Sequence, residues 1–482
     1  MNWSRRDLGP VTAPDTNKMI AVTHLGAGGS LTYVTGQKAA SGGTTQISTW
    51  QYLDDGTPGW ATGGNPPERV WPAVPDGPCY GVAACADGAS GVYVAGAAHK
   101  AGEGLNIAVL HYDAAGNLTQ GFPYIYNYAP QNGDDVPVAM DLDFAQGALW
   151  VVGRSQGVGT GNDYVLIGLP TGAGALTTTL VIRYNHLSNG SDVPVAVKAA
   201  PVLSVGTNTL GVFVTGTSFD AATKDDIMTI EYQVDGLTGG WHSPWSRRYT
   251  GQGGATTERA VDLVIAATNE AIGVYVAGNR GTGSRNFLTL GYPRTPGPST
   301  PDPWAQEYNN GGDDQAVKIA WGFKEGMTVP RIYVAGSSVG TGATYDMAVV
   351  AYDAPNGASS PGWGTPFRSG EDESDDRVSD MIVVEDNHLY IAGRWYNGAD
   401  LDYRVYKLDL LNPSEAWTVP PDYDVGAGGS DFAAALTYRD NPEPPIPGGE
   451  RSHCDIFVTG RNRTIFEVEF RYATVKFSQF VN

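Results

Sequence analysis

The chain has 482 residues, a formal net charge of −21 and a hydrophobic content of 41%. This acidity disfavours binding to nucleic acid or to anionic membranes, because both need a basic footprint. No apolar stretch reaches the ~20 residues of a membrane-spanning helix. Residues 1–22 lack the apolar core of a signal peptide, so the chain is expected to be either cytosolic or a mature exported form.

A short motif recurs from one end of the chain to the other: an apolar pair of β-formers, a small residue and a glycine. Its copies are at residues 32–36, 92–96, 149–153, 212–216, 274–278, 332–336, 389–393 and 456–460. They lie about 60 residues apart, a period typical of propellers, solenoids and arrays. Each copy is predicted to be the second strand, B, of one repeat unit.

Three further strands are expected in each unit. Strand A is an apolar run after an acidic turn, as at residues 315–320. Strand C follows a polar loop, as at residues 107–113, and strand D often begins with Trp and ends with Tyr, as at residues 304–308. Short runs joined by turns predict a four-stranded antiparallel meander. Strands A and B are apolar almost throughout, which indicates sheets covered on both faces.

The two ends of the chain predict a closed ring. The last unit ends with a strand C at residues 472–477 and has no strand D of its own. Residues 3–6 read Trp-Ser-Arg-Arg, identical to the fourth strand D at residues 245–248. The N-terminal strand is therefore expected to complete the last unit and remove the free sheet edges. The prediction is an all-β fold, a single eight-bladed β-propeller of four-stranded antiparallel blades spanning residues 1–482.

The three cysteines suggest no disulfide. Cys79 and Cys85 fall in one predicted strand, on the same face, where six residues span about 20 Å, beyond disulfide reach. Cys454 is remote in sequence. Three free and mostly buried thiols are expected.

At several of these segments the pattern resembles the bacterial β-propeller repeats called SBBP repeats. The matching stretches are residues 308–314, 274–278, 163–167 and 471–477. The resemblance covers nearly the full length and implies a secreted or cell-surface bacterial protein, commonly without an assigned activity. The chain departs from the repeat in its irregular A–B connections, the longest from Arg439 to Ser452 and another near Pro201 to Leu210.

Acidic residues recur at two positions that a meander places on one face of the ring. The D–A turns carry Asp134, Asp135, Asp192, Glu258, Asp313, Asp314, Asp375, Asp376 and Asp431, and strand C opens with Asp163, Asp226, Asp346 and Asp402. The first two units have Asn17 and Gly77 at the turn position instead. One interpretation is that these side chains cap their own turns. The other is an acidic mouth that binds Ca²⁺ or a cationic ligand, although no turn has the spacing of a calcium loop.

Other functional motifs are absent from the sequence. There is no HExxH, no Gly-x-Ser-x-Gly and no Walker loop, and the seven histidines are scattered, so no zinc site, catalytic residue or cofactor is predicted. The tryptophans expected in strand D are Trp3, Trp245, Trp304, Trp363 and Trp417. They are predicted to pack between blade edges, with stacking on sugar rings as the alternative.

The sequence therefore favours a non-enzymatic exported scaffold that presents one face to a protein or polysaccharide partner. The alternative is a hydrolase or lyase acting on polysaccharide through carboxylates in the central funnel. The two differ in one structural feature. An enzyme needs a cluster of unlike residues at the channel, contributed by particular blades.

Overall fold

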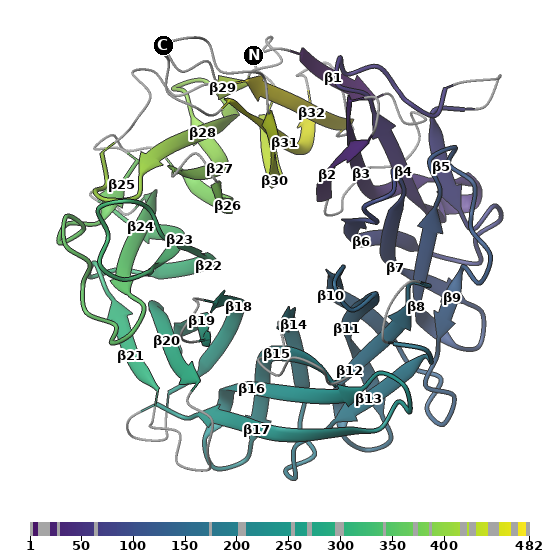
Figure 1. Ribbon diagram of the computed structural model, residues 1–482, viewed down its shortest axis with the longest axis horizontal. Coiled ribbons are helices and arrows are strands. Elements are labelled where there is room, and N and C mark those ends of the chain that lie inside the picture. Colours follow the sequence, from purple (N-terminus) through teal and green to yellow (C-terminus); the bar gives the residue numbers. More distant parts are fainter. Residues whose placement is uncertain are drawn as a thin grey trace.

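A computed structural model describes residues 3–7, 20–26, 29–61, 66–172, 176–200, 209–251, 256–267, 272–294, 303–340, 344–369, 375–384, 388–414, 422–423, 430–441, 453–463 and 471–478. Its strands form eight separate four-stranded antiparallel sheets arranged in a ring (Figure 1). No α-helix occurs in these ranges, whose single helical turn is the 3-10 segment Ser41–Gly43. Accordingly, the described part of the chain has no helix long and apolar enough to cross a membrane.

The first four blades take up the first half of the chain. Blade 1 is β2 (Ile20–Gly26), β3 (Gly29–Ala39), β4 (Thr45–Tyr52) and β5 (Glu68–Trp71). Blade 2 is β6 (Cys79–Ala86), β7 (Val92–Lys100), β8 (Gly104–Tyr112) and β9 (Tyr124–Tyr126). Blade 3 is β10 (Asp135–Asp143), β11 (Ala148–Gly157), β12 (Gly161–Pro170) and β13 (Leu180–Tyr184). Blade 4 is β14 (Asp192–Ala200), β15 (Thr209–Asp220), β16 (Lys224–Asp235) and β17 (Trp241–Tyr249).

The remaining blades follow in the same order. Blade 5 is β18 (Glu258–Ala267), β19 (Ile272–Arg280), β20 (Asn286–Arg294) and β21 (Trp304–Tyr308). Blade 6 is β22 (Asp314–Gly322), β23 (Arg331–Val339), β24 (Tyr345–Asp353) and β25 (Phe367–Arg368). Blade 7 is β26 (Arg377–Val384), β27 (His388–Tyr396), β28 (Leu401–Asp409) and β29 (Asp422–Tyr423). Blade 8 contains β30 (Ser430–Asn441), β31 (His453–Arg463), β32 (Arg471–Ser478) and β1 (Trp3–Asp7).

The predicted ring closure is confirmed by the pairing of the two terminal strands. β1 lies antiparallel to β32, with Trp3 opposite Lys476 and Asp7 opposite Tyr472. Blade 8 is thereby built from both ends of the chain, which meet at the top of Figure 1. β1 is thus the outermost strand of blade 8 and covers the outer edge of β32, which ties the last unit to the first.

Strand A of blades 2 to 8 contains a β-bulge that the sequence did not predict. In blade 2 the register shifts between Gly81 and Ala83. A bulge inserts one extra residue and so breaks the alternation of side chains. Cys79 consequently packs towards blade 1, whereas Cys85 packs towards blade 3. The prediction that these cysteines share a face is wrong, while both are free thiols as expected.

The core lies between blades. Seven hydrophobic clusters each join one blade to the next, and an eighth brings Val34 and Tyr52 of blade 1 against Ala434 of blade 8. The glycine that closes strand B is needed for this approach. A Cβ on Gly153 would lie 2.6 Å from the Val136 carbonyl and 2.8 Å from Ile107 of the preceding blade. The prediction of strands covered on both faces is thus confirmed.

Two predicted strand D tryptophans contribute to the same contacts. The indole nitrogen of Trp304 donates to Ala354 of blade 6, at 3.0 Å. That of Trp363 donates to Leu410 of blade 7, at 3.1 Å, although this residue precedes β25 instead of opening it. Trp245 packs on Tyr292 of blade 5. The side chains of Trp3 and Trp417, Asn17, Cys454 and most of the two long A–B connections lie outside the described residues.

Candidate functional site: the acidic rim and the charged channel

The rim is defined here as the D–A and B–C connections with the first residues of strands A and C. These connections do share one face, as the meander predicted. The Asp134 carboxylate accepts the Leu105 amide, at 3.0 Å. The Asp313 carboxylate accepts the Arg285 amide, at 2.8 Å. Each contact joins a D–A turn to the B–C connection of the preceding blade.

The acids that begin strand A are buried and close their own turns. Asp135, Asp192 and Asp314 have relative exposures of 1%, 0% and 0%. One oxygen of each accepts a backbone amide, respectively of Tyr128, His186 and Asn310, at 2.7 Å in every case. The other oxygen of each has no hydrogen-bond partner among the described residues. Turn capping, the first of the two interpretations, is therefore what these carboxylates do in the fold.

The acids that open strand C are bound by arginines from strand D. Asp163 pairs with Arg183 at 2.6 Å, and Asp226 pairs with Arg248 at 2.7 Å. Asp346 pairs with Arg368 in the same way in blade 6. The arginine also binds the serine that lies opposite the acid on strand B. These serines are Ser155, Ser218 and Ser338.

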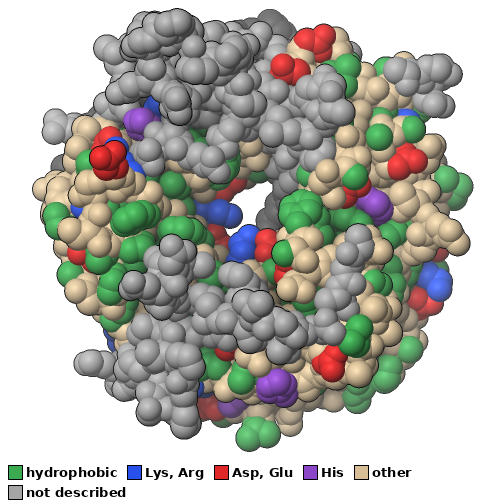
Figure 2. Space-filling view, viewed as in Figure 1, with side chains coloured by type: hydrophobic (Ala, Val, Ile, Leu, Met, Phe, Trp, Pro, Cys, Tyr) green, Lys and Arg blue, Asp and Glu red, His purple; other side chains and the backbone are tan. Residues whose placement is uncertain are grey.

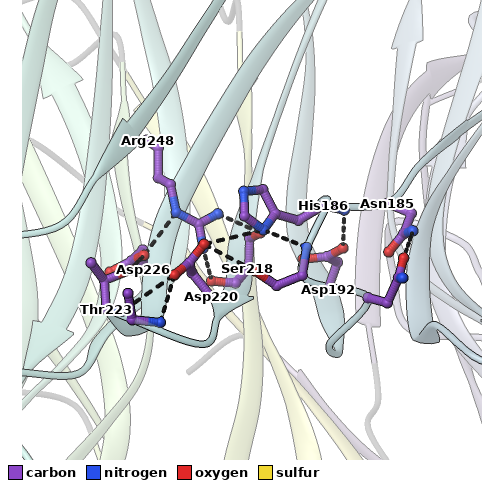
Figure 3. Close-up of polar contacts among 11 residues, drawn as sticks. Asn185, His186, Asp192, Ser218, Asp220, Thr223, Asp226 and Arg248 are labelled. Carbon is purple, nitrogen blue, oxygen red and sulfur yellow. Dashed lines mark hydrogen bonds and ion pairs between the residues drawn. The ribbon is translucent and has the colours of Figure 1, made fainter.

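Figure 3 shows this network in blade 4. The Arg248 guanidinium lies between Asp226 and Ser218, and donates to the Ser218 hydroxyl at 2.8 Å and its carbonyl at 2.9 Å. Asp192 lies on the D–A turn beside it, holding the amide of His186. Asp220, at the end of strand B, lies 3.6 Å from Nδ1 of His186, so three carboxylates and one guanidinium are gathered at the end of this sheet.

Blade 5 contains the same charges in exchanged positions. Arg280 occupies the strand B position of Ser218, opposite Asn286. Glu307 occupies the strand D position of Arg248. Arg280 lies 3.1 Å from Glu258 and also binds Glu307. The ion pair is kept although the arginine has moved from strand D to strand B and its acid from strand C to strand D, while the turn acid Glu258 keeps the strand A position of Asp192.

Three rim acids are less buried, and each has a partner. Asp313 binds the Arg285 guanidinium at 2.7 Å and the Tyr345 hydroxyl at 2.8 Å. The bond from Arg285 holds the pKa of Asp313 far below its ordinary value. The pKa of Asp375 is also lowered, because Arg377 and Arg394 outweigh the effect of its burial. Asp134 is exposed and caps Leu105.

The remaining predicted site residues are buried in blades 7 and 8. Asp376 accepts from the Ser369 hydroxyl at 2.8 Å, and Asp402 accepts from Asn397 at 2.6 Å. Asp431 has a relative exposure of 0%. All thirteen predicted acids except Asp134, Asp313 and Asp375 are buried, so the structure distributes them among the ends of separate sheets.

Burial also changes the protonation of the turn acids. It raises the pKa of Asp135, Asp192 and Glu258 above the ordinary values, because an ionised carboxylate is poorly solvated there. The rim would have to supply several carboxylates to one ion in order to bind calcium. Among the described residues, no group of three or more His, Cys, Asp or Glu is arranged to hold a metal. Calcium at the rim stays a prediction.

The central channel contains a second set of charges, which the sequence analysis missed. The residue that resumes strand A pairing after the bulge is Ala in blades 2, 3, 4 and 8, but charged in blades 5, 6 and 7. These three residues are Asp262, Lys318 and Asp380. The Lys318 ammonium lies 3.4 Å from Asp262 and 3.6 Å from Asp380. Both carboxylates raise its pKa.

Blades 3 and 4 extend this line of charge. Lys198 binds Asp141 at 2.9 Å, and the other oxygen of Asp141 accepts the Ala199 amide of blade 4 at 2.8 Å. Asp380 likewise accepts the Leu436 amide of blade 8, at 2.9 Å. Figure 2 shows basic and acidic side chains together at the central opening. The signal that could have found them is a charged residue inside an otherwise apolar strand A.

Comparisons with known proteins leave the function open. A scan against protein-family models found no match, so the resemblance to SBBP repeats stays a prediction. A search of curated proteins found no match either.

Solved structures give distant likenesses. The Pseudomonas aeruginosa periplasmic gluconolactonase PpgL is 12% identical, with a TM-score of 0.40 over 73% of this chain and 85% of that protein. The polysaccharide lyase Uly1 is 10% identical, with a TM-score of 0.43 over 79% and 87%. An α-L-arabinofuranosidase from Fusarium graminearum is 11% identical, with a TM-score of 0.36 over 71% and 97%. None of these values carries an argument about activity, and the architecture rests on the sheet topology.

Proposed function

We propose that this protein is a non-enzymatic exported scaffold that presents one face of the propeller to a protein or polysaccharide partner. The observation that carries the proposal is the engagement of the rim carboxylates. In blades 3, 4 and 6 the strand C acid is bound by an arginine of its own sheet. Groups held this way maintain the fold and are not poised as an acid and a base.

The opposite face, formed by the A–B and C–D turns, is the better candidate for contact with a partner. Phe144 and Phe323 on A–B turns are 64% and 54% exposed, and Leu237 and Trp241 at a C–D turn are 57% and 47% exposed. Exposed aromatic side chains stack on sugar rings and supply the apolar contacts of protein interfaces. Figure 2 shows hydrophobic side chains at several places on one face of the ring.

The experiment compares two variants of the whole protein on a glycan array and in pull-downs from an extracellular extract. In the first, Phe144→Ser is combined with Phe323→Ser on the A–B turns. The matched control combines Val158→Ser with Leu187→Ser, which are 60% and 94% exposed on rim connections. The proposal expects a ligand for the wild type that the first variant loses and the control keeps. Turnover of a substrate by the wild type without any bound partner would contradict it.

The channel favours a second candidate, a hydrolase or lyase acting on polysaccharide. The observation is that the described blades differ. Asp141 binds Lys198 across blades 3 and 4, and Lys318 lies between Asp262 and Asp380 in blades 5 to 7. For this candidate, Asp262→Asn and Asp380→Asn would each abolish measured depolymerisation while leaving the melting temperature close to that of the wild type. Retention of activity in both variants would exclude it.

A further inference from the structure

A hydroxyl, an imidazole and a carboxylate lie in line at the C–D turn of blade 2. The Thr119 hydroxyl is 2.9 Å from Nδ1 of His111. Nε2 of the same ring is 3.0 Å from a carboxylate oxygen of Asp87. Thr119 belongs to the turn after β8, His111 to β8 itself and Asp87 to the A–B turn. With Nε2–H donating to Asp87, Nδ1 is left as an acceptor for the threonine proton.

The imidazole and the carboxylate are held rigidly. Asp87 accepts the amides of Ala89 and Gly91, both at 2.7 Å. Burial alone would raise the pKa of Asp87, but the bonds from His111 and these amides lower it overall, so the carboxylate is ionised. The His111 ring stacks on Tyr93 with centroids 3.9 Å apart. The histidine and aspartate side chains are 16% and 11% exposed, and Thr119 is partly exposed.

The same turn in other blades does not need this arrangement. The Thr119 amide donates to the His111 carbonyl at 3.0 Å, and the equivalent bonds are Ser360 to Ala351 at 3.1 Å in blade 6 and Gly59 to Gln51 at 2.8 Å in blade 1. Blade 6 keeps the hydroxyl without the imidazole, and blade 1 has neither. The backbone of the turn therefore forms without a histidine at this position.

Backbone donors follow the hydroxyl. The Phe122 amide returns to the Thr119 carbonyl at 3.2 Å, and Gly121 has φ +89°, a conformation that favours glycine. The amides of Gln120 and Gly121 have no acceptor within the described part of the chain, and both residues are exposed. Backbone amides directly after a nucleophile are well placed to stabilise the oxyanion formed when it attacks a carbonyl.

We propose that Thr119 is a covalent modification site that accepts an acyl group from an activated ester or thioester. Its oxygen forms a bond to the carbonyl carbon while its proton passes to Nδ1 of His111. The bond from that carbon to the donor oxygen or sulfur then breaks, and the proton moves from His111 to the departing alcohol or thiol. Asp87 is a positioning residue that holds the imidazole in the required tautomer.

The test treats the intact protein with p-nitrophenyl acetate and maps the acetyl groups by mass spectrometry of peptides. Thr57 is an internal control, because it lies half-buried on the C–D turn of blade 1 and its hydroxyl binds the Asp55 carboxylate at 2.6 Å, with no imidazole. We expect Thr119 to be acetylated about 100-fold faster than Thr57, the lower range of a general-base contribution. Thr119→Val should remove the adduct, and His111→Gln should slow it to the rate at Thr57.

The dependence of the Thr119 acetylation rate on pH distinguishes a general-base role of His111 from a purely structural one. The groups facing His111 are Asp87, Tyr93 and Thr119, with Arg69 reaching the carbonyls of Ala115 and Gly116 on the same turn. The wild-type acetylation rate should level off over part of the pH range instead of rising in proportion to hydroxide throughout. A rate proportional to hydroxide, or equal acetylation of Thr119 and Thr57, overturns the proposal, and both readouts need only the wild-type protein.

Discussion

Blades 4 and 5 are neighbours with the same four strands, yet they place the arginine and the acid of their ion pair on different strands. Blade 4 has Asp226 on strand C and Arg248 on strand D. Blade 5 has Arg280 on strand B and Glu307 on strand D. The comparison teaches that the guanidinium that binds the acids at this end of a sheet can come from different strands.

The turn acids of the two blades correspond as well. Asp192 and Glu258 each begin strand A of their blade. In both blades burial raises the pKa of the turn acid. A set of residues that exchanges places while keeping its ion pairs is a structural network. A site that recognises a ligand would have to keep its positions.

The largest expected effect comes from removing the guanidinium of blade 4. Arg248→Leu leaves Asp226, which has a relative exposure of 0%, as a buried charge without its partner. We expect the free energy of unfolding to fall by about 3–5 kcal/mol, measured by urea denaturation. A loss below ~1 kcal/mol would mean that the pair is not needed, and the likeness between the two blades would then be coincidental.

The second prediction converts blade 5 towards the arrangement of blade 4. Glu307→Arg alone places a second guanidinium beside Arg280, and should cost about 1 kcal/mol in urea unfolding, because Glu307 is exposed and water screens the repulsion. Adding Arg280→Ser and Asn286→Asp rebuilds the serine, aspartate and arginine of blade 4 at matching register positions. We expect the triple variant to recover most of that loss, because the three residues are in contact and their effects are coupled. If the three substitutions instead lowered the free energy of unfolding additively, the charged positions of blades 4 and 5 would not be equivalent.

The third prediction concerns pH and the turn acid Asp192. Since the pKa of Asp192 is raised in the folded protein, the native state holds this proton more tightly than the unfolded chain does. Its contribution to stability is therefore present below the unfolded pKa of about 4 and declines as pH rises through the folded pKa. Asp192→Asn removes the titration, and should be more stable than the wild type at neutral pH by about 1 kcal/mol.

Asp313 is a control for that experiment, because its pKa is shifted in the opposite direction. Its pKa is lowered by Arg285, so its contribution is present above the unfolded pKa and is lost as pH falls towards the folded one. Asp313→Asn should therefore lower the free energy of unfolding at neutral pH. It should not change the slope of that free energy against pH in the neutral and alkaline range. If the stability of the two variants depended on pH in the same way, the burial of Asp192 and the pairing of Asp313 would not have opposite effects on stability.

The sequence was sufficient for the architecture because one strand motif repeats in every blade and the N-terminal strand shares a tetrapeptide with strand D of blade 4. It did not predict the bulges, because one extra residue in an apolar run does not change the composition of that run. Cys79 and Cys85 were assigned to one face for that reason. The acids were located correctly, but their partners were not foreseen, because the arginines that bind them come from a different strand of the sheet.

Three positions of the network change together in blade 2. Blade 2 has Gly77 at the D–A turn, Asn106 at the start of strand C and Ile125 where blade 3 has Arg183. The acid, its companion and the arginine are lost together, which indicates that they form one network. The channel charges had a simpler signal, a lysine such as Lys318 within an apolar strand A, that was present in the sequence and overlooked.

The smallest expected effect lies one residue away from the network, where the same chemistry is exposed. Arg259 follows Glu258 and binds Asp225, which precedes Asp226, at 2.8 Å across the junction of blades 4 and 5. The two side chains are 66% and 25% exposed, so water and salt screen their attraction. Arg259→Gln should lower the free energy of unfolding by about 0.2–1 kcal/mol, and added salt should erase even that difference. Since Arg259→Gln and Arg248→Leu each remove one guanidinium from an aspartate, their unequal losses in the same urea titration would isolate burial as the cause. Equal losses would show that charge alone matters, and that the exchanged arrangement of blade 5 has no structural meaning.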